Sequence, residues 1–526
     1  MKARTRTHNA VLNATLVGST QIIIMICQFI LQSVFIRMLG TTYLGLHGLF
    51  LNLFTLLSFA ELGVGSAITF ALFKPLKEKN FEEILSLVNW LRKLYQKVAL
   101  IMFVGGLILL PFLNLIVDDI AVIGSMVYVY FLLALTSSTS VYLVAHKRIL
   151  LLAEQRTYID SLNQLVFTTS MITLQVISLF IWQNFFLFLV INLLFTLFSN
   201  LRISLLVNKL YADVFSSRSV KVKSEQLKEI KKNTLGLVGS KIGEIVILNT
   251  ENIFISAFVG LASAGIFLSY QMVLRGLQSI VNQAINAVVA TFGNLRLDEN
   301  REKEYNIYKK SMFINWALSY FLCIFLLTLF NEFVSMWLGE SYLFSWQIVV
   351  LMVINYYVLQ MRSTQVVFIK SQGLFVKVGI KSIIEAIFSL LLIVIFVVIL
   401  DLGIIGVLFA SLGVNVLLNL WVEPWIVHKY GFGKKLSLTY FITYVGGMIL
   451  TFSSGLGIYY VLPEIQGLLG FILRLAIVFV FSTTIFISLF HKREEFKVLK
   501  ELSFRMMKML RNKKDLSNGK LEESKK

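Results

Sequence analysis

The chain has 526 residues, 57% of them hydrophobic, and a mean hydropathy of +0.79. Apolar runs of about 20 residues, the length that crosses a bilayer as a helix, recur from end to end. This excludes a soluble globular protein and predicts an all-α polytopic membrane protein. The formal net charge of +19 does not indicate a nucleic-acid partner, because no basic block with interleaved aromatic residues lies on a soluble domain.

The sequence contains no motif with the residue spacing of a known catalytic or metal site. Cys27 and Cys323 both lie inside apolar runs, so neither a disulfide framework nor a zinc site is predicted. The five histidines form no cluster with metal-ligand spacing, and no Gly-x4-Gly-Lys-Ser/Thr phosphate loop occurs. We therefore expect a protein that is not an enzyme and that needs no metal or other cofactor.

In chain order, hydropathy predicts about 14 transmembrane helices. The first apolar run is too long for a signal peptide and lacks a small-residue cleavage site, so we expect it to be a retained helix. Between the second and third helices, residues 81–96 have one apolar face and predict a helix on the inner membrane surface. The predicted spans are 11–38, 43–73, 97–117, 120–145, 158–182, 184–207, 233–258, 261–294, 311–331, 342–369, 378–400, 402–427, 438–461 and 466–490.

The distribution of charge predicts the orientation in the membrane. If the N-terminus is inside, all but five of the 48 lysines and arginines lie in inner segments or at the helix ends that adjoin them. This is the positive-inside pattern, and it predicts cytoplasmic N- and C-termini and attraction to anionic membrane lipids. The predicted outer loops carry acids instead, namely Asp118, Asp119, Glu332, Glu340, Asp401 and Glu464.

The five remaining basic residues are Arg37, Lys241, Arg275, Arg362 and Arg474. Each could reach a lipid headgroup by snorkelling or could pair with a neighbouring acid. Arg37 lies near the predicted outer end of its helix and fits that explanation. Lys241, Arg275 and Arg362 lie deeper, and for these three we favour a position in a polar cavity.

An internal repeat is present at an offset of 220 residues. Gly40 and Gly45, at the first outer hairpin, correspond to Gly260 and Gly265. Because each half has an even number of predicted spans, the repeat is parallel, with its axis along the membrane normal. We therefore expect two six-helix lobes and two extra C-terminal helices. The predicted divisions are 1–207 for the N-lobe, 208–232 for a cytoplasmic linker, 233–428 for the C-lobe, 429–490 for spans 13 and 14, and 491–526 for a basic cytoplasmic tail.

A polar stripe on the eighth predicted span is the main functional signal. Gln271, Arg275, Gln278, Asn282 and Asn286 recur at steps of three or four residues, which places them on one face of a helix. Such a stripe in a membrane helix is costly unless it faces water, protein or a polar passenger. The stripe therefore predicts one wall of a cavity that binds substrate.

Other predicted spans also carry polar residues. Interhelical hydrogen bonds of about 1 kcal/mol each explain isolated examples, whereas stripes on several helices favour a shared water-accessible path. The acids could pair with bases or could bind a coupling ion, either a proton or Na⁺. The further cavity candidates are Gln28, Gln32, Asn52, Asn415, Asn419, Lys241 and Arg362, and the coupling candidates are Glu61, Glu244, Glu251 and Glu385.

Four segments near the N-terminus form a recognisable set of motifs: RTRTHN (4–9), FIRMLGTTYLGLHGLF (35–50), AELGVGSA (60–67) and FKPLK (73–77). With these motifs the chain resembles the Wzx-like polysaccharide flippases of the MOP superfamily, which also contains MATE exporters and the lipid II flippase MurJ. The resemblance implies a two-lobed alternating-access transporter of the bacterial cytoplasmic membrane.

The implied passenger is an oligosaccharide repeat unit on undecaprenyl diphosphate, moved from the inner to the outer leaflet for capsule or exopolysaccharide synthesis. Polysaccharide polymerases and glycosyltransferases are its implied partners. Amide and hydroxyl side chains suit sugar hydroxyls, and Arg275 with Lys241 nearby suits the diphosphate.

One departure from MurJ-like proteins argues against lipid II as the passenger. Those proteins carry arginines in the first, second and eighth spans near the cavity. Here Arg275 matches the eighth span, the second span carries Glu61, and Arg37 lies too far outward to match the first. The alternatives are a MATE-type exporter of small molecules, which a basic cavity disfavours, and a membrane polymerase or other non-transporting component, which the short outer loops disfavour.

Overall fold

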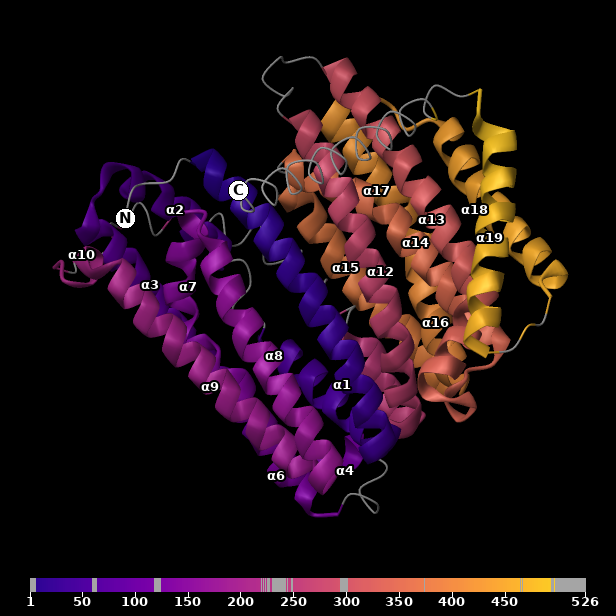
Figure 1. The fold of residues 1–526 in the computed structure, drawn as a ribbon. Helices are drawn as coiled ribbons and strands as arrows, with labels where there is room; N and C mark the ends of the chain where they lie inside the picture. Colours follow the sequence, from indigo (N-terminus) through magenta and orange to yellow (C-terminus); the bar gives the residue numbers. More distant parts are fainter. Residues whose placement is uncertain are drawn as a thin grey trace, which may run out of the picture. The chain divides into compact units, whose positions relative to one another are not determined.

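The computed structural model describes residues 6–58, 64–117, 124–218, 249–293, 301–372, 374–463 and 467–492, with isolated residues at 220, 222, 224, 228, 243, 245, 246, 465 and 496. These residues form helices and no strand. Ten of the described helices are long and apolar enough to cross a membrane. The predicted fold class, an all-α polytopic membrane protein, is confirmed (Figure 1).

The chain contacts divide the molecule into two compact units. The first comprises 1–276 and 374–418, and the second comprises 277–373 and 419–526. Helix α12 (Leu261–Gly293) contributes to both, because the division falls at Gly276. The lobe boundaries expected at 207 and 233 stay a prediction, and part of the linker and most of the tail lie outside the described residues.

The first unit is built mainly from the N-terminal helices. Helix α1 packs on α8, α3 packs on α7, and α6 packs on α9. Aromatic side chains fill one core, in which the rings of Phe50 and Phe131 meet edge to face at 5.1 Å. Its helices are α1 (Arg6–Leu57), α2 (Val64–Glu78), α3 (Phe81–Leu109), α4 (Leu113–Ile116), α6 (Met126–Ser140), α7 (Tyr142–Ala153), α8 (Thr157–Trp182), α9 (Phe185–Leu210), α10 (Ala212–Phe215), α15 (Phe375–Ile393) and α16 (Gly403–Val414).

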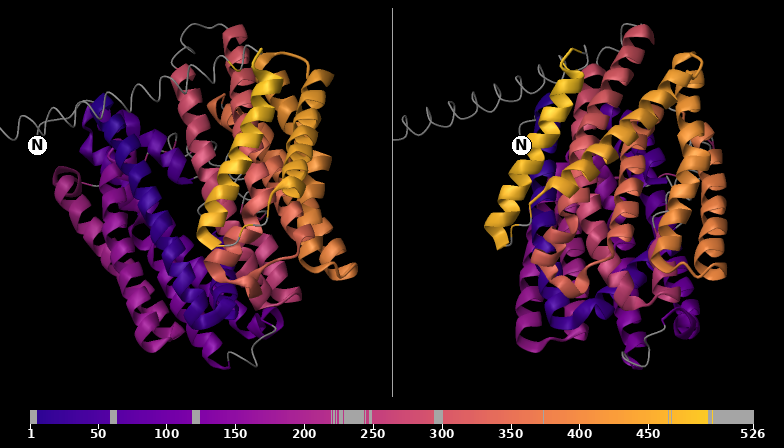
Figure 2. Two further views of the ribbon diagram at one scale, coloured as in Figure 1. Left: turned by 45° about the vertical axis from the view of Figure 1, so that its right-hand side comes forward. Right: turned by 90° about the vertical axis from the view of Figure 1, so that its right-hand side faces the viewer.

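The second unit is organised around its longest helix, α13 (Arg301–Leu338), which packs against α14, α18 and α19. The C-terminal pair α18 and α19 is drawn in orange to yellow in Figure 2, and the two helices contact each other. α18 has the predicted bounds of the thirteenth span, and α19 begins one residue later than predicted. The other helices are α14 (Trp346–Ser371), α17 (Leu420–Ile426), α18 (Leu438–Val461) and α19 (Gly467–Phe490).

The two glycines expected at the outer hairpins have left-handed backbone. α1 is interrupted at Gly40, where φ is 85°, and Gly260, which precedes α12, has a φ of 112°. Residues with a Cβ rarely adopt these angles, so both positions favour glycine. Gly40 and Gly260, which are 220 residues apart, thus share a positive φ, as the internal repeat predicts.

One local prediction is wrong. Residues 81–96 do not form a separate surface helix, because α3 runs without interruption from Phe81 to Leu109. The apolar face exists, but Ile84, Val88 and Leu91 are buried in a second core of the first unit. The periodicity of the sequence identified the apolar face correctly. This face packs against α2 and α7 and does not lie on the membrane surface.

The predicted eleventh and twelfth spans contain wide helical turns, and a further wide turn begins where the twelfth span ends. π-helical segments occupy Val394–Ile399, Asn415–Asn419 and Val427–Phe432. Pro424, within α17, has no N–H to donate to the carbonyl of Leu420, which weakens the regular ladder there. π-Helical turns interrupt α-helices frequently at functional sites, and two candidate residues, Asn415 and Asn419, lie in one of them.

Candidate functional site

The predicted stripe lies on one continuous helix, α12. Arg275 is exposed, and Gln271, Gln278 and Asn282 are half-buried. Asn286 belongs to the helix, but its side chain lies outside the described part of the chain. Amide groups one turn above and one turn below therefore flank the exposed guanidinium.

A carboxylate accompanies Arg275 within the first unit. Glu251, on the helical segment that precedes Gly260, accepts a hydrogen bond from Ser411 of α16 and interacts electrostatically with Arg275. Glu251 is half-buried. A carboxylate and a guanidinium on neighbouring membrane helices lower the cost of burying each other. Protonation of Glu251, or an anionic ligand at Arg275, would change the electrostatic interaction between the two side chains.

An ion pair lies on α15. The Lys381 ammonium is 2.5 Å from the Glu385 carboxylate, one helical turn away, and each side chain is 4% exposed. The neighbouring Ser382 faces Gly243, where an added Cβ would come within 2.5 Å of the serine backbone oxygen. Gly243 thus lies close to the backbone of α15 beside the pair.

The remaining candidates of the first unit make mostly local bonds. The Gln32 amide donates to the Ser269 hydroxyl at 2.8 Å and so ties α1 to α12, whereas Gln28 is exposed. Asn52 donates to the carbonyl of Gly48 in its own helix at 2.8 Å. Asn415 does the same to the carbonyl of Ser411 at 2.8 Å. Gln32 thus connects the first helix to the helix that carries the stripe.

In the second unit Arg362 is held by an acid. Its Nε and Nη2 donate to the two oxygens of Glu423 at 3.0 and 2.6 Å, a bidentate pair. The arginine side chain is 16% exposed and the glutamate side chain 2%. The charge of Arg362 is therefore balanced within the protein, and an anionic passenger at this position would have to compete with Glu423.

An aromatic and amide group extends this pair. Tyr440 donates its hydroxyl proton to the Gln365 amide oxygen at 2.6 Å when the amide nitrogen faces the carbonyls of Met361 and Arg362. Buried His428 stacks edge to face with Tyr440 at 5.9 Å. Gln365 thus joins Tyr440 to the backbone of Arg362, and His428 packs against that tyrosine.

The stripe residue Asn282 joins a separate amide cluster. Gln360 donates to the side-chain oxygens of Asn282 at 3.3 Å and of Asn315 at 3.0 Å. Asn315 in turn donates to the Gln360 carbonyl at 2.7 Å and to the Thr364 hydroxyl at 3.0 Å. The cluster connects α12, α13 and α14, and both Gln360 and Asn315 are fully buried.

Sequence reasoning found some partners and missed others. Glu423 belongs to a polar stripe on the twelfth predicted span, a signal that could have paired it with Arg362. Asn315 and Gln360 are single amides in apolar surroundings, and no spacing marked them. Asn419 is buried. Three predicted site residues, Lys241, Glu244 and Glu61, lie outside the described residues.

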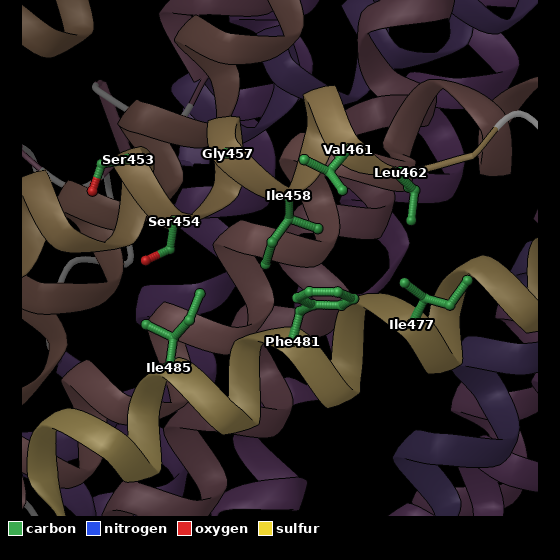
Figure 3. Close-up of a pocket in the computed structure, with 9 residues that line it drawn as sticks. All are labelled: Ser453, Ser454, Gly457, Ile458, Val461, Leu462, Ile477, Phe481 and Ile485. Carbon is green, nitrogen blue, oxygen red and sulfur yellow. The ribbon is translucent and has the colours of Figure 1, made fainter.

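A cavity of about 340 Å³ opens between α18 and α19 (Figure 3). Ile458, Ile477 and Phe481 line it, and Ser453 and Ser454 supply its polar atoms. None of the predicted site residues contributes to it. Its lining suits hydrocarbon and not a charged headgroup.

No protein-family model matches the chain, and no curated protein matches it. Among solved structures it is similar to "Lipid II flippase MurJ, inward closed conformation", with a TM-score of 0.66 at 14% identity over 91% of this chain and 99% of that one. It is also similar to an inward-facing multidrug resistance MATE family transporter of the MOP superfamily, with a TM-score of 0.49 at 16% identity over 78% and 97% of the two chains. The first likeness shows a shared fold over nearly the whole length of both chains.

Proposed function

We propose that the protein is a flippase that moves an oligosaccharide linked to undecaprenyl diphosphate from the inner to the outer leaflet of a bacterial cytoplasmic membrane. The observation that carries the proposal is the polar face of α12, with exposed Arg275 between half-buried Gln271 and Gln278. The shared fold with a protein named as a lipid flippase supports it. In this proposal the passenger serves capsule or exopolysaccharide synthesis.

The charges favour Arg275 over Arg362 as the group that binds the diphosphate. Arg362 donates to both oxygens of Glu423, so a phosphate would have to displace an internal partner. Arg275 is exposed, and its electrostatic partner Glu251 also accepts a hydrogen bond from Ser411. Guanidinium suits phosphate oxygens because its N–H groups can bind two of them at once.

The same arrangement suggests how an ion could drive transport. Protonation of Glu251, or a cation bound to it, would weaken its attraction to Arg275 and favour binding of the diphosphate there. Glu385 is the second coupling candidate, but Lys381 already neutralises it. We therefore place the coupling role on Glu251, with alternating access of the α12 face to the two sides of the membrane.

The test is a flipping assay in proteoliposomes with a fluorescent undecaprenyl-diphosphate oligosaccharide. Arg275→Ala should slow flipping at least about tenfold, a cost of about 1.4 kcal/mol, while Arg275→Lys should retain more of the rate. Arg474→Gln is the control, because Arg474 is also a membrane-helix arginine but pairs with Glu332 at 2.8 Å. Export of small organic cations without flipping by the wild type would favour the exporter alternative instead.

Labelling of introduced cysteines by water-soluble thiol reagents provides a second test of the same site. In a variant without Cys27 and Cys323, cysteine at Gln271 or Gln278 should react with membrane-impermeant thiol reagents. Cysteine at Ile280 should not, because Ile280 is an apolar side chain, 51% exposed, on the opposite face of α12. Equal labelling at all three positions would contradict a water-accessible polar face.

A further inference from the structure

Two aromatic rings and a lysine meet near the end of α17 in the second unit. The Lys429 ammonium lies over the Trp425 ring, 4.7 Å from its centroid, and over the Tyr430 ring at 5.5 Å. The two rings meet edge to face at 5.4 Å. Each of the three side chains therefore contacts the other two, and we refer to them as the Trp425–Lys429–Tyr430 group.

The group presents a positive charge on the surface. Trp425 is 42% exposed and Tyr430 39% exposed, and Lys429 is also exposed. Aromatic rings attract an ammonium through their electron-rich faces and leave its charge in place. The acid on the same helical stretch, Glu423, is 2% exposed and accepts hydrogen bonds from Arg362 on both oxygens. The rings thus hold the ammonium in position without neutralising it.

The group lies at the end of a candidate membrane span. The stretch Gly403–Phe432 is long and apolar enough to cross a bilayer, and Lys429 is in its last turn. The helix ends at Gly433, where φ is 67°, and the charge distribution predicts that this end is cytoplasmic. Tryptophan and tyrosine favour the membrane–water interface, because each has an apolar body and a polar tip. This position matches the layer in which lipid headgroups lie.

The internal repeat provides a comparison for the group. At the offset of 220 residues, its members correspond to Leu205, Lys209 and Leu210. Lys209 is exposed and lies in the last turn of α9, as Lys429 lies in the last turn of its own helix. Leu205 is 60% exposed. A terminal lysine between leucines therefore suffices to end a span in the first half, so the rings around Lys429 indicate an additional role.

We propose that the Trp425–Lys429–Tyr430 group binds the headgroup of an anionic phospholipid at the inner membrane surface. Lys429 donates to the phosphate oxygens, while the rings hold the ammonium and lie beside the upper part of the lipid chains. A phospholipid fits better than a protein partner, because it offers an anionic headgroup and apolar chains at the same boundary. The site does not depend on the proposed transport function, since it requires only a membrane lipid.

Photo-crosslinking of the purified full-length protein tests this site. The probe is phosphatidylglycerol that carries a diazirine, compared with the zwitterionic phosphatidylcholine analogue. Peptide mass spectrometry measures the label on residues 421–435 at a lipid concentration below saturation. Lys429→Gln should lower labelling by phosphatidylglycerol about fivefold, as expected for one basic residue lost at an anionic lipid surface. Lys209→Gln removes the same charge at the corresponding position of the first half and should leave this labelling unchanged.

A second variant separates the rings from the charge. Trp425→Leu with Tyr430→Leu introduces the residues that the first half carries at these positions, so the variant should fold, and thermal unfolding checks this. It keeps Lys429 but loses the contacts of its ammonium with both rings, which should lower labelling by phosphatidylglycerol about two- to fivefold. Lys429→Arg should be labelled as the wild type is, because arginine also binds phosphate and stacks on rings.

Three results would overturn the proposal. Wild-type labelling of the leucine variant, or an equal fall in Lys209→Gln, would mean that phosphatidylglycerol responds to general surface charge. Equal labelling of the wild type by both lipids would show that the site does not select an anionic headgroup. Displacement of phosphatidylglycerol by an equimolar amount of undecaprenyl diphosphate would assign the site to the passenger instead of a phospholipid.

Discussion

Gly45 and Gly265 make reciprocal contacts across the internal repeat. A Cβ at Gly45 would overlap the carbonyl oxygen of Leu261, and a Cβ at Gly265 would overlap the carbonyl oxygen of Thr41. Leu261 follows Thr41 by the same 220 residues that separate the two glycines. The start of the second part of α1 and the start of α12 are therefore related by a local two-fold axis, and each glycine admits the backbone of the other segment.

The first prediction concerns this contact. Gly45→Ala should destabilise the protein by about 1–3 kcal/mol, because the obstructing atoms are backbone and cannot rotate away. Gly18→Ala, also in α1, is the control: among the described residues nothing lies within 4 Å of its added Cβ, and helical Gly→Ala gains about 0.5–1 kcal/mol. Thermal unfolding in detergent measures both. A similar midpoint for the two variants would mean that the contact tolerates a methyl group.

The second prediction concerns Arg362 and Glu423. Loss of one partner, in Arg362→Gln or Glu423→Gln, leaves a largely buried charge without its ion-pair partner and should cost about 3–5 kcal/mol. Arg362→Met combined with Glu423→Leu removes both charges and should recover most of the stability. Unfolding midpoints of the three variants test this. If the double variant is less stable than both single variants, the pair contributes net stability of its own.

The third prediction tests the coupling role of Glu251. Glu251→Gln should abolish the dependence of flipping on an imposed proton or Na⁺ gradient, because the side chain can then neither carry charge nor release a proton. Exchange of the passenger between the two leaflets in the absence of a gradient should persist. Flipping rates in proteoliposomes with and without each gradient provide the measurement. Glu332→Gln serves as control, since Glu332 pairs with Arg474 in the second unit; gradient dependence that survives in Glu251→Gln would place the coupling elsewhere.

The fourth prediction concerns the amide cluster of α12, α13 and α14. Gln360→Leu leaves Asn315 and Asn282 without their shared donor, and an unsatisfied buried polar group costs about 1–3 kcal/mol. The stability loss should be accompanied by greater exposure of Asn282, which a cysteine at that position would report through faster thiol labelling. Gln360→Leu with Asn315→Leu should be less destabilised than the sum of the two single variants. Strict additivity would indicate that the two amides do not act together.

Prediction from sequence succeeded where the cause is local. The apolar length needed to cross a bilayer and the positive φ that favours glycine depend on a few adjacent residues, so the ends of α18 and the special roles of Gly40 and Gly260 could be expected. The amphipathic face at 81–96 was also local and correctly identified. Its environment was not, because the partners that bury it, α2 and α7, lie elsewhere in the chain.

The sequence by itself determined that this is a polytopic membrane protein with a repeat and with a polar face on α12, since hydrophobic length, charge asymmetry and helical spacing can each be read along one segment. Tertiary structure alone decided which polar residues are already satisfied. Arg362 and Glu423 are 61 residues apart, and no local pattern could show that one neutralises the other while Arg275 stays exposed. A buried charge takes its partner from whichever helix packs beside it, so the chemistry available to a passenger is set by packing.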